Sequence, residues 1–194
     1  FPGTKANRFI EWFTFSPESI DGKSKTKAYA LFETSFEDSI EVGTIKGLQQ
    51  IHAYIFGGLY DFAGQLRTKN IAKGGYKFEY AQYLNSTLLQ IDQMPETNFG
   101  EIVEKYVAMN KAHPFMEGNG RSTRIWLDLL LKKQIKCSID WSKISKVNYM
   151  NAMIISSVDS SELSKLLKHA LTSDIHSREM YMKGIDYSYY YEEN

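Results

Sequence analysis

The chain has 194 residues, of which 43% are hydrophobic, and this suits one soluble globular domain with or without a small appendage. Its 23 basic and 23 acidic residues give no net charge, so direct nucleic-acid binding by bulk electrostatics is not expected. The single cysteine, Cys137, excludes an intramolecular disulfide and a cysteine-cluster zinc site.

Targeting and membrane signals are weak. The first residues have neither the basic start nor the apolar run of a signal peptide. The densest apolar run, Ile125–Leu131, is far too short to cross a bilayer. We therefore expect a cytoplasmic protein of bacterial type with no membrane partner.

Most of the chain has the apolar spacing of amphipathic helices. Four apolar stripes run over 45–62, 84–91, 99–107 and 125–131, and further helices are predicted over about 142–157 and 160–171. Pro95 ends the helix of the second stripe, and Asn98 and Glu101 have the spacing of a capping box at the start of the third.

Residues 66–80 depart from the helical pattern. Gly74 and Gly75 lie between short segments of alternating character, which is a signal of a β-hairpin. An ordinary surface loop is the alternative. The predicted fold class is therefore all-α with one small β-hairpin.

The segment that begins at His113 contains the most informative residues. A helix is predicted to end near His113 and another to begin near Gly120, while Gly118 and Gly120 allow positive φ and close approach of a ligand. The free N–H groups at the start of the second helix favour an anion. Arg121 and Arg124, three residues apart, project from one face and suit phosphate oxygens.

Two other side chains in this segment add chemistry to a phosphate cradle. Glu117 supplies a hard oxygen ligand that, with phosphate oxygens, can hold Mg²⁺. His113 is the residue that can act as a base near neutral pH. Each feature alone is more typical of a turn, a structural histidine or a solvated face, but together they predict phosphoryl or nucleotidyl transfer.

This segment also resembles a known signature. It reads HPFMEGNGRSTR from His113 to Arg124, and it is similar at every specified position to the Fic motif His-x-Phe-x-Asp/Glu-Gly-Asn-Gly-Arg-x-x-Arg. Residues 51–56 and 60–67 resemble the helix that leads into the family's flap, and residues 71–78 resemble the flap hairpin. The resemblance covers about residues 40–175 and implies a Fic fold, a bundle of about six to eight helices with a short β-hairpin flap over the active site.

The resemblance to the Fic family implies a nucleotidyltransferase that moves AMP from ATP to a Tyr, Ser or Thr hydroxyl of a target protein. His113 would deprotonate that hydroxyl, and Glu117 would hold Mg²⁺ between the α- and β-phosphates. Arg121 and Arg124 would bind the β- and γ-phosphates. The residues implied to form the anion hole are Gly118, Asn119 and Gly120.

The flap would align the target segment by strand addition. The flap residues implied in docking are Lys73, Gly74 and Gly75, although a lysine in a hairpin is more often solvated. The predicted organisation is an N-terminal extension over 1–35, a Fic catalytic domain over 36–175 that includes the flap at 66–80, and a C-terminal helix over 176–194.

The C-terminal residues carry four tyrosines within 187–191 beside two carboxylates. One interpretation is a last helix that docks through its aromatic side chains. The other is a resemblance to the inhibitory helix of single-domain Fic proteins, which has Ser/Thr-x-x-x-Glu followed by Gly or Asn. Ser188 and Glu192 fit this spacing, but the residue after Glu192 is Glu193 and not Gly or Asn. In the alternative register the glutamate is Glu193, which precedes Asn194, and Tyr189 then stands in place of Ser or Thr.

If the inhibitory resemblance holds, the carboxylate of Glu192 pairs with Arg124 where the ATP γ-phosphate would bind. Two alternatives to AMP transfer stay open: an enzyme that removes AMP from a modified protein, and a nucleotide-sensing module with little turnover. The presence of a base at His113 favours an enzyme. Self-modification at the tail tyrosines and assembly into a homo-oligomer are further hypotheses.

Four other side chains are predicted to be structural. His52 lies on a helical stripe and is interpreted as a satisfied, partly buried side chain. Trp126 and Trp141 are expected in the core, and Phe115 is expected to anchor the loop after His113.

Overall fold

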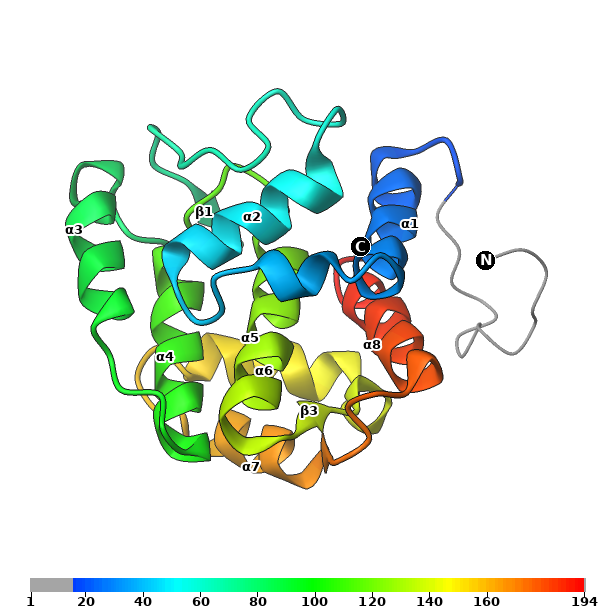
Figure 1. Ribbon diagram of the computed structural model, residues 1–194. Helices are drawn as coiled ribbons and strands as arrows, with labels where there is room; N and C mark the ends of the chain where they lie inside the picture. Colours follow the sequence, from blue (N-terminus) through cyan, green and yellow to red (C-terminus); the bar gives the residue numbers. More distant parts are fainter. Residues whose placement is uncertain (1–15, 194) are drawn as a thin grey trace.

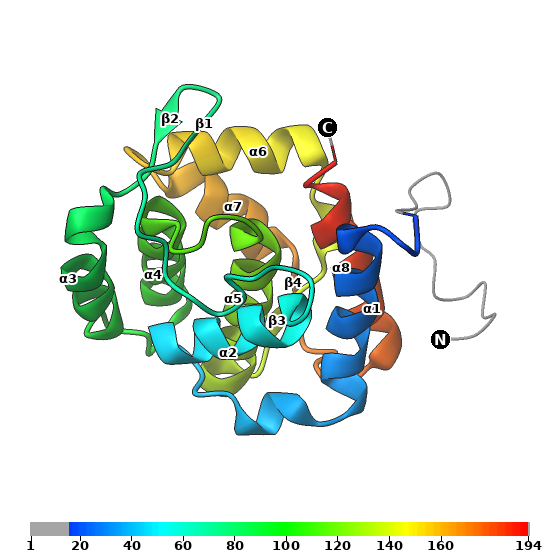
Figure 2. The same ribbon diagram turned by 90° about the horizontal axis from the view of Figure 1, so that it is seen from above.

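The computed structural model describes residues 16–193, and within them it is mainly helical with two small antiparallel sheets (Figures 1 and 2). The all-α class with one short hairpin is confirmed. In chain order the elements are α1 (Ile20–Glu33), η2 (Phe36–Ser39), α2 (Ile45–Phe56), β1 (Ala72–Lys73), β2 (Tyr76–Lys77), α3 (Ala81–Asp92), α4 (Phe99–Ala112), α5 (Asn119–Ile135), β3 (Ser138–Ile139), η3 (Trp141–Lys143), α6 (Lys146–Ile155), α7 (Ser161–His169), β4 (Leu171–Thr172) and α8 (Arg178–Tyr190).

Helix α5 forms the centre of the bundle. It packs against α2, α4 and α8, and Figure 1 shows it surrounded by these helices. Its residues 121–127 and 129–131 are buried, so the helix has no solvated face over much of its length. Trp126 and Trp141 are both buried in the core, as predicted. The central position of α5 fixes its N-terminus, which carries the predicted phosphate cradle.

Several helices differ at their ends from the sequence prediction. Helix α2 ends at Phe56, although the apolar spacing continues to Phe62, because Gly57 leaves the helical conformation and Gly58 has a φ of +77°. The helix predicted over 142–157 is divided into η3 and α6, with Ser145 as the N-cap of α6. Residues 141–143 form a separate 3-10 turn that is capped by Asp140 and contains the buried Trp141.

The predicted capping box is also only half present. Asn98 accepts a hydrogen bond from the backbone N–H of Glu101 at 3.0 Å, as an N-cap does. The carboxylate of Glu101 turns instead to the backbone and hydroxyl of Thr97, both at 2.7 Å. The capping-box spacing therefore predicted the start of α4 correctly, but it did not predict the partner of the Glu101 side chain.

The flap hairpin predicted at Gly74–Gly75 is present. Ala72 pairs with Lys77 and Lys73 pairs with Tyr76. Gly74 and Gly75 have φ values of +56° and +82°, which a two-residue turn of this twist requires. Figure 2 shows the hairpin extending from the body of the molecule above α4.

Helix α1 and the β3–β4 pair are not predicted from the sequence. Helix α1 packs against α2 and α8, and its residues Ala28 and Leu31 are fully buried. It falls within the extension predicted over 1–35, of which residues 1–15 lie outside the described part. Helix α1 packs beside α8, and Asp21 in its first turn forms an ion pair with Arg121 near the start of α5.

Helix α8 begins after Ser177, which caps it by accepting from the N–H of Met180 at 3.1 Å. It packs against α1, α5 and η3, and the last residues lie near the start of α5. Among residues 16–193, no helix has both the length and the apolar character needed to cross a membrane.

Candidate active site

The turn between α4 and α5 has a strained but well-supported backbone. His113 is the C-cap of α4 and has a φ of +48°, and Gly118 is the N-cap of α5 with a φ of +79°. A Cβ atom on Gly118 would lie 2.3 Å from the ring of Phe56. Glycine is therefore required at this position both by conformation and by space. The result is a tight turn that places His113 beside the start of α5.

The side chain of Asn119 closes this turn. Its Oδ1 accepts from the N–H of Phe115 at 2.9 Å, and its Nδ2 donates to the Phe115 carbonyl at 2.7 Å. The ring of Phe115 is fully buried, as expected for a loop anchor. The amide of Asn119 is thus used within the loop, so any contribution to the predicted anion hole comes from its backbone N–H.

His52 supports the same turn from α2. Its Nδ1 accepts from the N–H of Gly64 at 2.8 Å, so its Nε2 carries the proton and donates to the Glu117 carbonyl at 2.8 Å. Its ring stacks on that of Phe115 with centroids 3.9 Å apart. Burial lowers the pKa of His52 to about 4, against the opposing effect of the bond to Glu117. His52 is therefore a neutral, satisfied structural side chain, as interpreted from the sequence.

Arg67 is a buried residue to which the sequence analysis assigned no role. Its backbone N–H donates to the Pro114 carbonyl at 2.9 Å. Its guanidinium donates to four backbone carbonyls, which belong to Lys69, Glu79, Ala112 and His113, at 2.5–2.9 Å. Arg67 therefore ties the base of the flap to the turn after α4. No local pattern in the sequence signals this role, because every acceptor is a backbone group brought near by tertiary structure.

His113 lies between this turn and the flap. Its ring stacks on the ring of Phe78 with centroids 3.6 Å apart and an interplanar angle of 9°. Its Nδ1 lies 3.2 Å from the carbonyl of Asn110, which favours a proton on Nδ1 and leaves Nε2 free to accept one. Burial lowers the pKa of His113 to about 4, outweighing the Asn110 bond and the charge of Glu192. The imidazole is neutral at neutral pH, as a general base must be.

Arg124 is fully engaged by the end of α8. Its Nη2 lies 2.5 Å from Oε1 of Glu192, and its Nε donates to the hydroxyl of Ser188 at 2.7 Å. Its Nη2 also donates to the Ser188 carbonyl at 2.8 Å. The ion pair between Glu192 and Arg124 expected from the inhibitory resemblance is thus part of this structure, with the arginine side chain only 4% exposed.

The carboxylate of Glu192 lies directly over the start of α5. A Cβ atom on Gly120 would come within 2.1 Å of its Oε1, and its Oε2 lies 3.8 Å from Nζ of Lys73 in the flap. Burial alone would raise the pKa of Glu192, but Arg124 and then Arg121 and Lys73 hold it below its usual value. The neighbouring Glu193 is exposed, so the structure adopts the Glu192 register; Asn194 lies outside the described residues.

Two tyrosines fix the C-terminal segment. The hydroxyl of Tyr189 lies 2.9 Å from the hydroxyl of Ser24 on α1. The hydroxyl of Tyr191 contacts the carbonyls of Trp141 at 2.8 Å and Ile144 at 2.7 Å. Both rings are buried, which accounts for part of the unusual tyrosine content of the tail.

Arg121 has a different set of neighbours from Arg124. It forms an ion pair with Asp21 in the first turn of α1, and its Nη2 lies 3.7 Å from Glu117 Oε2. Its guanidinium lies over the rings of Phe56 and Tyr189, at 5.0 and 5.8 Å from their centroids. Sequence reasoning missed Asp21, because only the packing of α1 brings it to this site.

The remaining predicted residues lie at the mouth of the site. Glu117 is 64% exposed, and its Oε2 accepts from the N–H of Gly118 at 3.4 Å. Lys73 is likewise 64% exposed on β1. Within residues 16–193 there is no cluster of three or more His, Cys, Asp or Glu side chains that could hold a metal. A cation at Glu117 would therefore need further oxygen ligands from a bound nucleotide.

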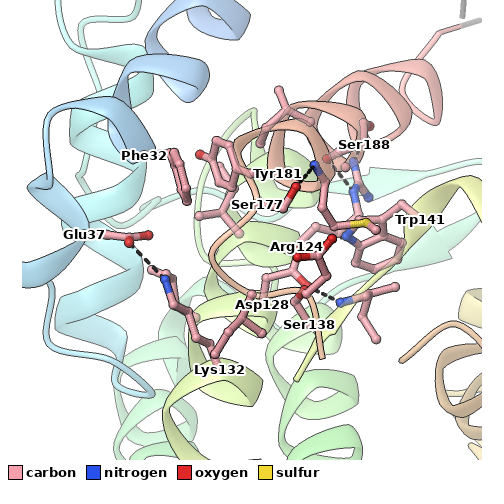
Figure 3. A pocket seen from close by; sticks show the side chains of 18 residues that line it. Phe32, Glu37, Arg124, Asp128, Lys132, Ser138, Trp141, Ser177, Tyr181 and Ser188 are labelled. Atoms are coloured by element: carbon pink, nitrogen blue, oxygen red, sulfur yellow. Dashed lines mark hydrogen bonds and ion pairs between the residues drawn. The ribbon is translucent and has the colours of Figure 1, made fainter. Parts of the chain in front are cut away.

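A small pocket of about 50 Å³ lies behind Arg124, between α5, α8 and β3 (Figure 3). Asp128, one turn after Arg124, accepts from the N–H of Ile139 and from Trp141 Nε1, both at 2.9 Å. Burial raises the pKa of Asp128 to about 7 despite these bonds. The cavity holds only a few water-sized molecules, so it is not a nucleotide site.

Comparisons with known proteins agree with this geometry. Residues 43–131 match the model of the Fic/DOC family. Protein adenylyltransferase VbhT of Bartonella schoenbuchensis is 29% identical over 160 residues, which cover 75% of this chain and 32% of VbhT. Probable protein adenylyltransferase y4lH of Sinorhizobium fredii is 30% identical over 116 residues, which cover 54% of this chain and 60% of y4lH. The chain thus spans less than two thirds of either relative.

Solved structures give the same fold. The BepC protein of Bartonella tribocorum, crystallised with bound AMPPNP, has a TM-score of 0.66 at 17% identity, covering 84% of this chain and 90% of that one. Fic-1 of C. elegans has a TM-score of 0.63 at 15% identity, covering 82% of this chain and 51% of that one. Over residues 43–131 the chain is therefore similar to the Fic/DOC family, and its described part has the Fic fold.

Proposed function

We propose that this chain is a protein adenylyltransferase, which transfers AMP from ATP to a Tyr, Ser or Thr hydroxyl of a target protein. The observation that carries the proposal is the position of His113, a neutral imidazole that lies across a tight turn from the N-terminus of α5. The buried Arg124 lies in the second turn of that helix. VbhT is named a protein adenylyltransferase and y4lH a probable one, and both names support the same reaction class.

In the proposed reaction, the hydroxyl oxygen of the target attacks the α-phosphorus of ATP. The bond from that phosphorus to the α,β-bridging oxygen breaks, and pyrophosphate leaves. The hydroxyl proton passes to Nε2 of His113, which is free because Nδ1 faces the Asn110 carbonyl. Stacking on Phe78 keeps the ring in this orientation.

The start of α5 is proposed to bind the phosphates. The backbone N–H groups of Gly118, Asn119 and Gly120, together with the helix dipole, favour an anion there. Arg124 and Arg121 then bind the outer phosphates once their present carboxylate partners are displaced. Glu117 fits a Mg²⁺ ion, since it offers one exposed carboxylate beside this helix start; the ion would neutralise charge on the phosphate oxygens.

Glu192 is proposed to inhibit this reaction within the chain. Its carboxylate lies at the helix start and pairs with Arg124, so it occupies the position of a terminal phosphate. ATP that binds beside it would have its α-phosphate misaligned for in-line attack. Lys73 of the flap is drawn to the same carboxylate. We infer that release of Glu192 frees Arg124 to bind the nucleotide. It also frees the flap residues Lys73, Gly74 and Gly75 for target docking.

A labelling experiment tests the proposed function. Purified Glu192→Gly protein is incubated with Mg²⁺, a bacterial lysate and ATP labelled on the α-phosphate. The proposal predicts a labelled protein whose mass rises by one AMP, and no label in the Glu192→Gly, His113→Ala double variant. ATP labelled on the γ-phosphate serves as a control and should give no labelled protein through this site.

Binding of ATP without any transfer would contradict the proposal and favour the nucleotide-sensing module. Loss of AMP from a pre-modified protein without transfer would favour the reverse enzyme. Intact-mass measurement of the protein itself tests self-modification at the tail tyrosines. Self-modification, homo-oligomer assembly and the domain boundaries stay predictions.

A further inference from the structure

An ion pair between Asp21 and Arg121 joins the first helix of the chain to the proposed phosphate site. Asp21 lies in the first turn of α1, and Arg121 lies in the first turn of α5. Residues 43–131 match the family model, so Asp21 and its helix lie outside the matched region. What this carboxylate does in the site must therefore be inferred from its contacts.

Arg121 is a buried cation that needs a charged partner. Its side chain is 6% exposed, and burial lowers the pKa of its guanidinium. A buried charge without a partner is costly, so the carboxylates beside it stabilise the folded site. Among residues 16–193, the ion-pair partners of Arg121 are Asp21 and Glu117, whose side chains are 34% and 64% exposed. Asp21 is therefore the more buried of the two carboxylates and the less screened by water.

The two carboxylates contact different ends of the guanidinium. Asp21 contacts Nη1, whereas Oε2 of Glu117 lies 3.7 Å from Nη2. The buried Nε of Arg121 has no hydrogen-bond acceptor within the part of the chain that the structure describes. Its N–H and one N–H of Nη2 point along the same edge of the planar group, and such an edge can bind two oxygen atoms of one phosphate. Asp21 leaves this edge available, and Glu117 is the carboxylate that a phosphate there would displace.

Release of the C-terminal segment makes Arg121 more dependent on Asp21. The centre of the Tyr189 ring, which belongs to that segment, lies 5.8 Å from the guanidinium carbon and would leave with it. Asp21 would stay, because its helix turn is fixed inside α1. Ser19 caps that turn by accepting from the N–H of Gly22 at 3.0 Å, and α1 also packs against α2. Asp21 can thus hold Arg121 in the state that binds the nucleotide.

We propose that Asp21 is a positioning residue for the nucleotide. It holds Nη1 of Arg121, so that the edge formed by Nε and Nη2 faces the outer phosphates of ATP. Arg121 contacts the nucleotide, and Asp21 acts only through Arg121. This role rests on the proposed transferase function, which supplies ATP as the ligand, and it makes α1 part of the catalytic unit.

Nucleotide binding tests this role without any need for catalysis. The background is the Glu192→Gly, His113→Ala variant, in which Arg124 is released and transfer of AMP is prevented. In this background, with Mg²⁺ present, Asp21→Asn should raise the Kd of ATP by about tenfold and leave the Kd of AMP within about twofold, as measured by calorimetry. AMP is the internal reference, because it lacks the outer phosphates that Arg121 would bind.

Three results would overturn the role of Asp21. An unchanged Kd for ATP would show that the carboxylate has no effect on binding of the phosphates. An equal rise in the Kd of both nucleotides would show a general effect on the fold of the site. A lower Kd for ATP would show that Asp21 competes with a phosphate instead of positioning Arg121.

Glu18→Gln is the matched control at the same helix end. Glu18 is exposed and lies one residue before the N-cap of α1, and within the described residues it is not an ion-pair partner of Arg121. Both substitutions remove one negative charge near the helix N-terminus, so any effect of the helix dipole or of net charge is similar. Glu18→Gln should leave both Kd values within about twofold of the background, and a rise for ATP of about tenfold would overturn the specific role of Asp21.

A double-variant cycle shows whether Asp21 acts through Arg121. Arg121→Ala alone should raise the Kd of ATP at least as much as Asp21→Asn does. Addition of Asp21→Asn to Arg121→Ala should then change this Kd by less than about twofold, because the guanidinium that Asp21 positions is absent. A further rise of about tenfold in the double variant would overturn the proposal, since Asp21 would then act by another route.

Asp21→Glu decides the matter if Asp21→Asn does not fold, which circular dichroism would show. Glutamate keeps the charge that the buried guanidinium needs, but it moves the carboxylate by one methylene group. The Kd of ATP should then rise by about threefold, while the Kd of AMP stays the same. An unchanged Kd for ATP in the folded variant would overturn the proposal.

Transfer kinetics in the Glu192→Gly background separate this role from the proposed function. With lysate protein as the acceptor, Asp21→Asn should raise the KM for ATP by about tenfold. If AMP is transferred and the KM for ATP is the same with and without this substitution, the role of Asp21 is wrong and the transferase function stands. If Asp21→Asn weakens ATP binding as expected but no variant transfers AMP, the transferase function is wrong and the role of Asp21 in nucleotide binding stands.

Discussion

The turn from His113 to Gly120 and the C-terminal segment from Tyr187 to Glu193 meet at one site but are held in different ways. The turn is fixed by bonds from side chains to its backbone, made by His52, Arg67 and Asn119. The tail is held mainly through its own side chains, with added bonds from Arg124 and Lys146 to its carbonyls. Because none of the three supports of the turn belongs to the tail, we expect the tail to leave without altering the turn.

This difference assigns separate roles to the two regions. A preorganised turn can present His113 and the helix start in a constant geometry, which is what transition-state stabilisation requires. A removable tail can compete with a phosphate for Arg124.

The largest effect is expected from removal of the proposed base. His113→Ala in the Glu192→Gly background should lower the rate of AMP transfer by about 10²–10⁴-fold, because general-base catalysis contributes that much. The measurement is single-turnover transfer at saturating ATP, with circular dichroism to check the fold. A rate within threefold of the parent would show that His113 does not take the proton.

A second prediction concerns the support of the turn. Asn119→Ala removes both hydrogen bonds to the backbone of Phe115 and leaves buried polar groups unpaired, so it should lower the free energy of unfolding by about 2–4 kcal/mol. Urea unfolding at neutral pH measures this loss. Stability equal to that of the wild type would mean that the turn does not depend on this side chain.

A third prediction uses the pH dependence of stability. Burial lowers the pKa of His52 in the folded protein to about 4, below the usual 6.5 of a histidine, so the stability that neutral His52 contributes is complete above pH 6.5 and is lost as the pH falls towards 4. At pH 5 the loss is about 2 kcal/mol for this residue. Between pH 7 and pH 5, the free energy of unfolding of a His52→Asn variant should therefore fall by about 2 kcal/mol less than that of the wild type. An unchanged decrease would contradict the neutral, buried histidine described here.

The smallest effect is expected in the tail. Tyr191→Phe removes contacts to the Trp141 and Ile144 carbonyls and should destabilise the tail by about 1 kcal/mol. Transfer activity of the otherwise wild-type protein should rise about two- to fivefold, because Glu192 leaves Arg124 more often. Tyr190→Phe, at a less buried neighbour, should change the activity less. Equal effects of the two variants would argue against Tyr191 as the anchor.

Much of this arrangement is readable in the sequence because it depends on local signals. Gly74 and Gly75 predicted the hairpin, since its turn needs positive φ at both positions. The apolar stripes predicted most of the core helices, and Gly118 and Gly120 marked the turn after α4. Ser188 and Glu192, which meet Arg124, were expected there only through the resemblance to the inhibitory helix of the family.

The remainder depends on contacts between distant segments. Helix α1 has only a few buried apolar residues and therefore no stripe, so neither the helix nor its Asp21 was predicted. Arg67 acts on backbone carbonyls that only the folded chain brings together. The β3–β4 pair has two residues in each strand, which is too short for a periodic signal.

The central claim is that Glu192, and not its neighbour, holds Arg124 away from the nucleotide. The most direct test compares AMP-transfer rates of Glu192→Gly and Glu193→Gly with the wild type at equal protein concentration. Both variants remove one carboxylate from adjacent positions at the same chain end, so net charge and composition are matched. Glu192→Gly should raise the rate at least about tenfold, equivalent to about 1.4 kcal/mol, while Glu193→Gly stays within about twofold of the wild type. Equal rates for Glu192→Gly and the wild type would contradict the account.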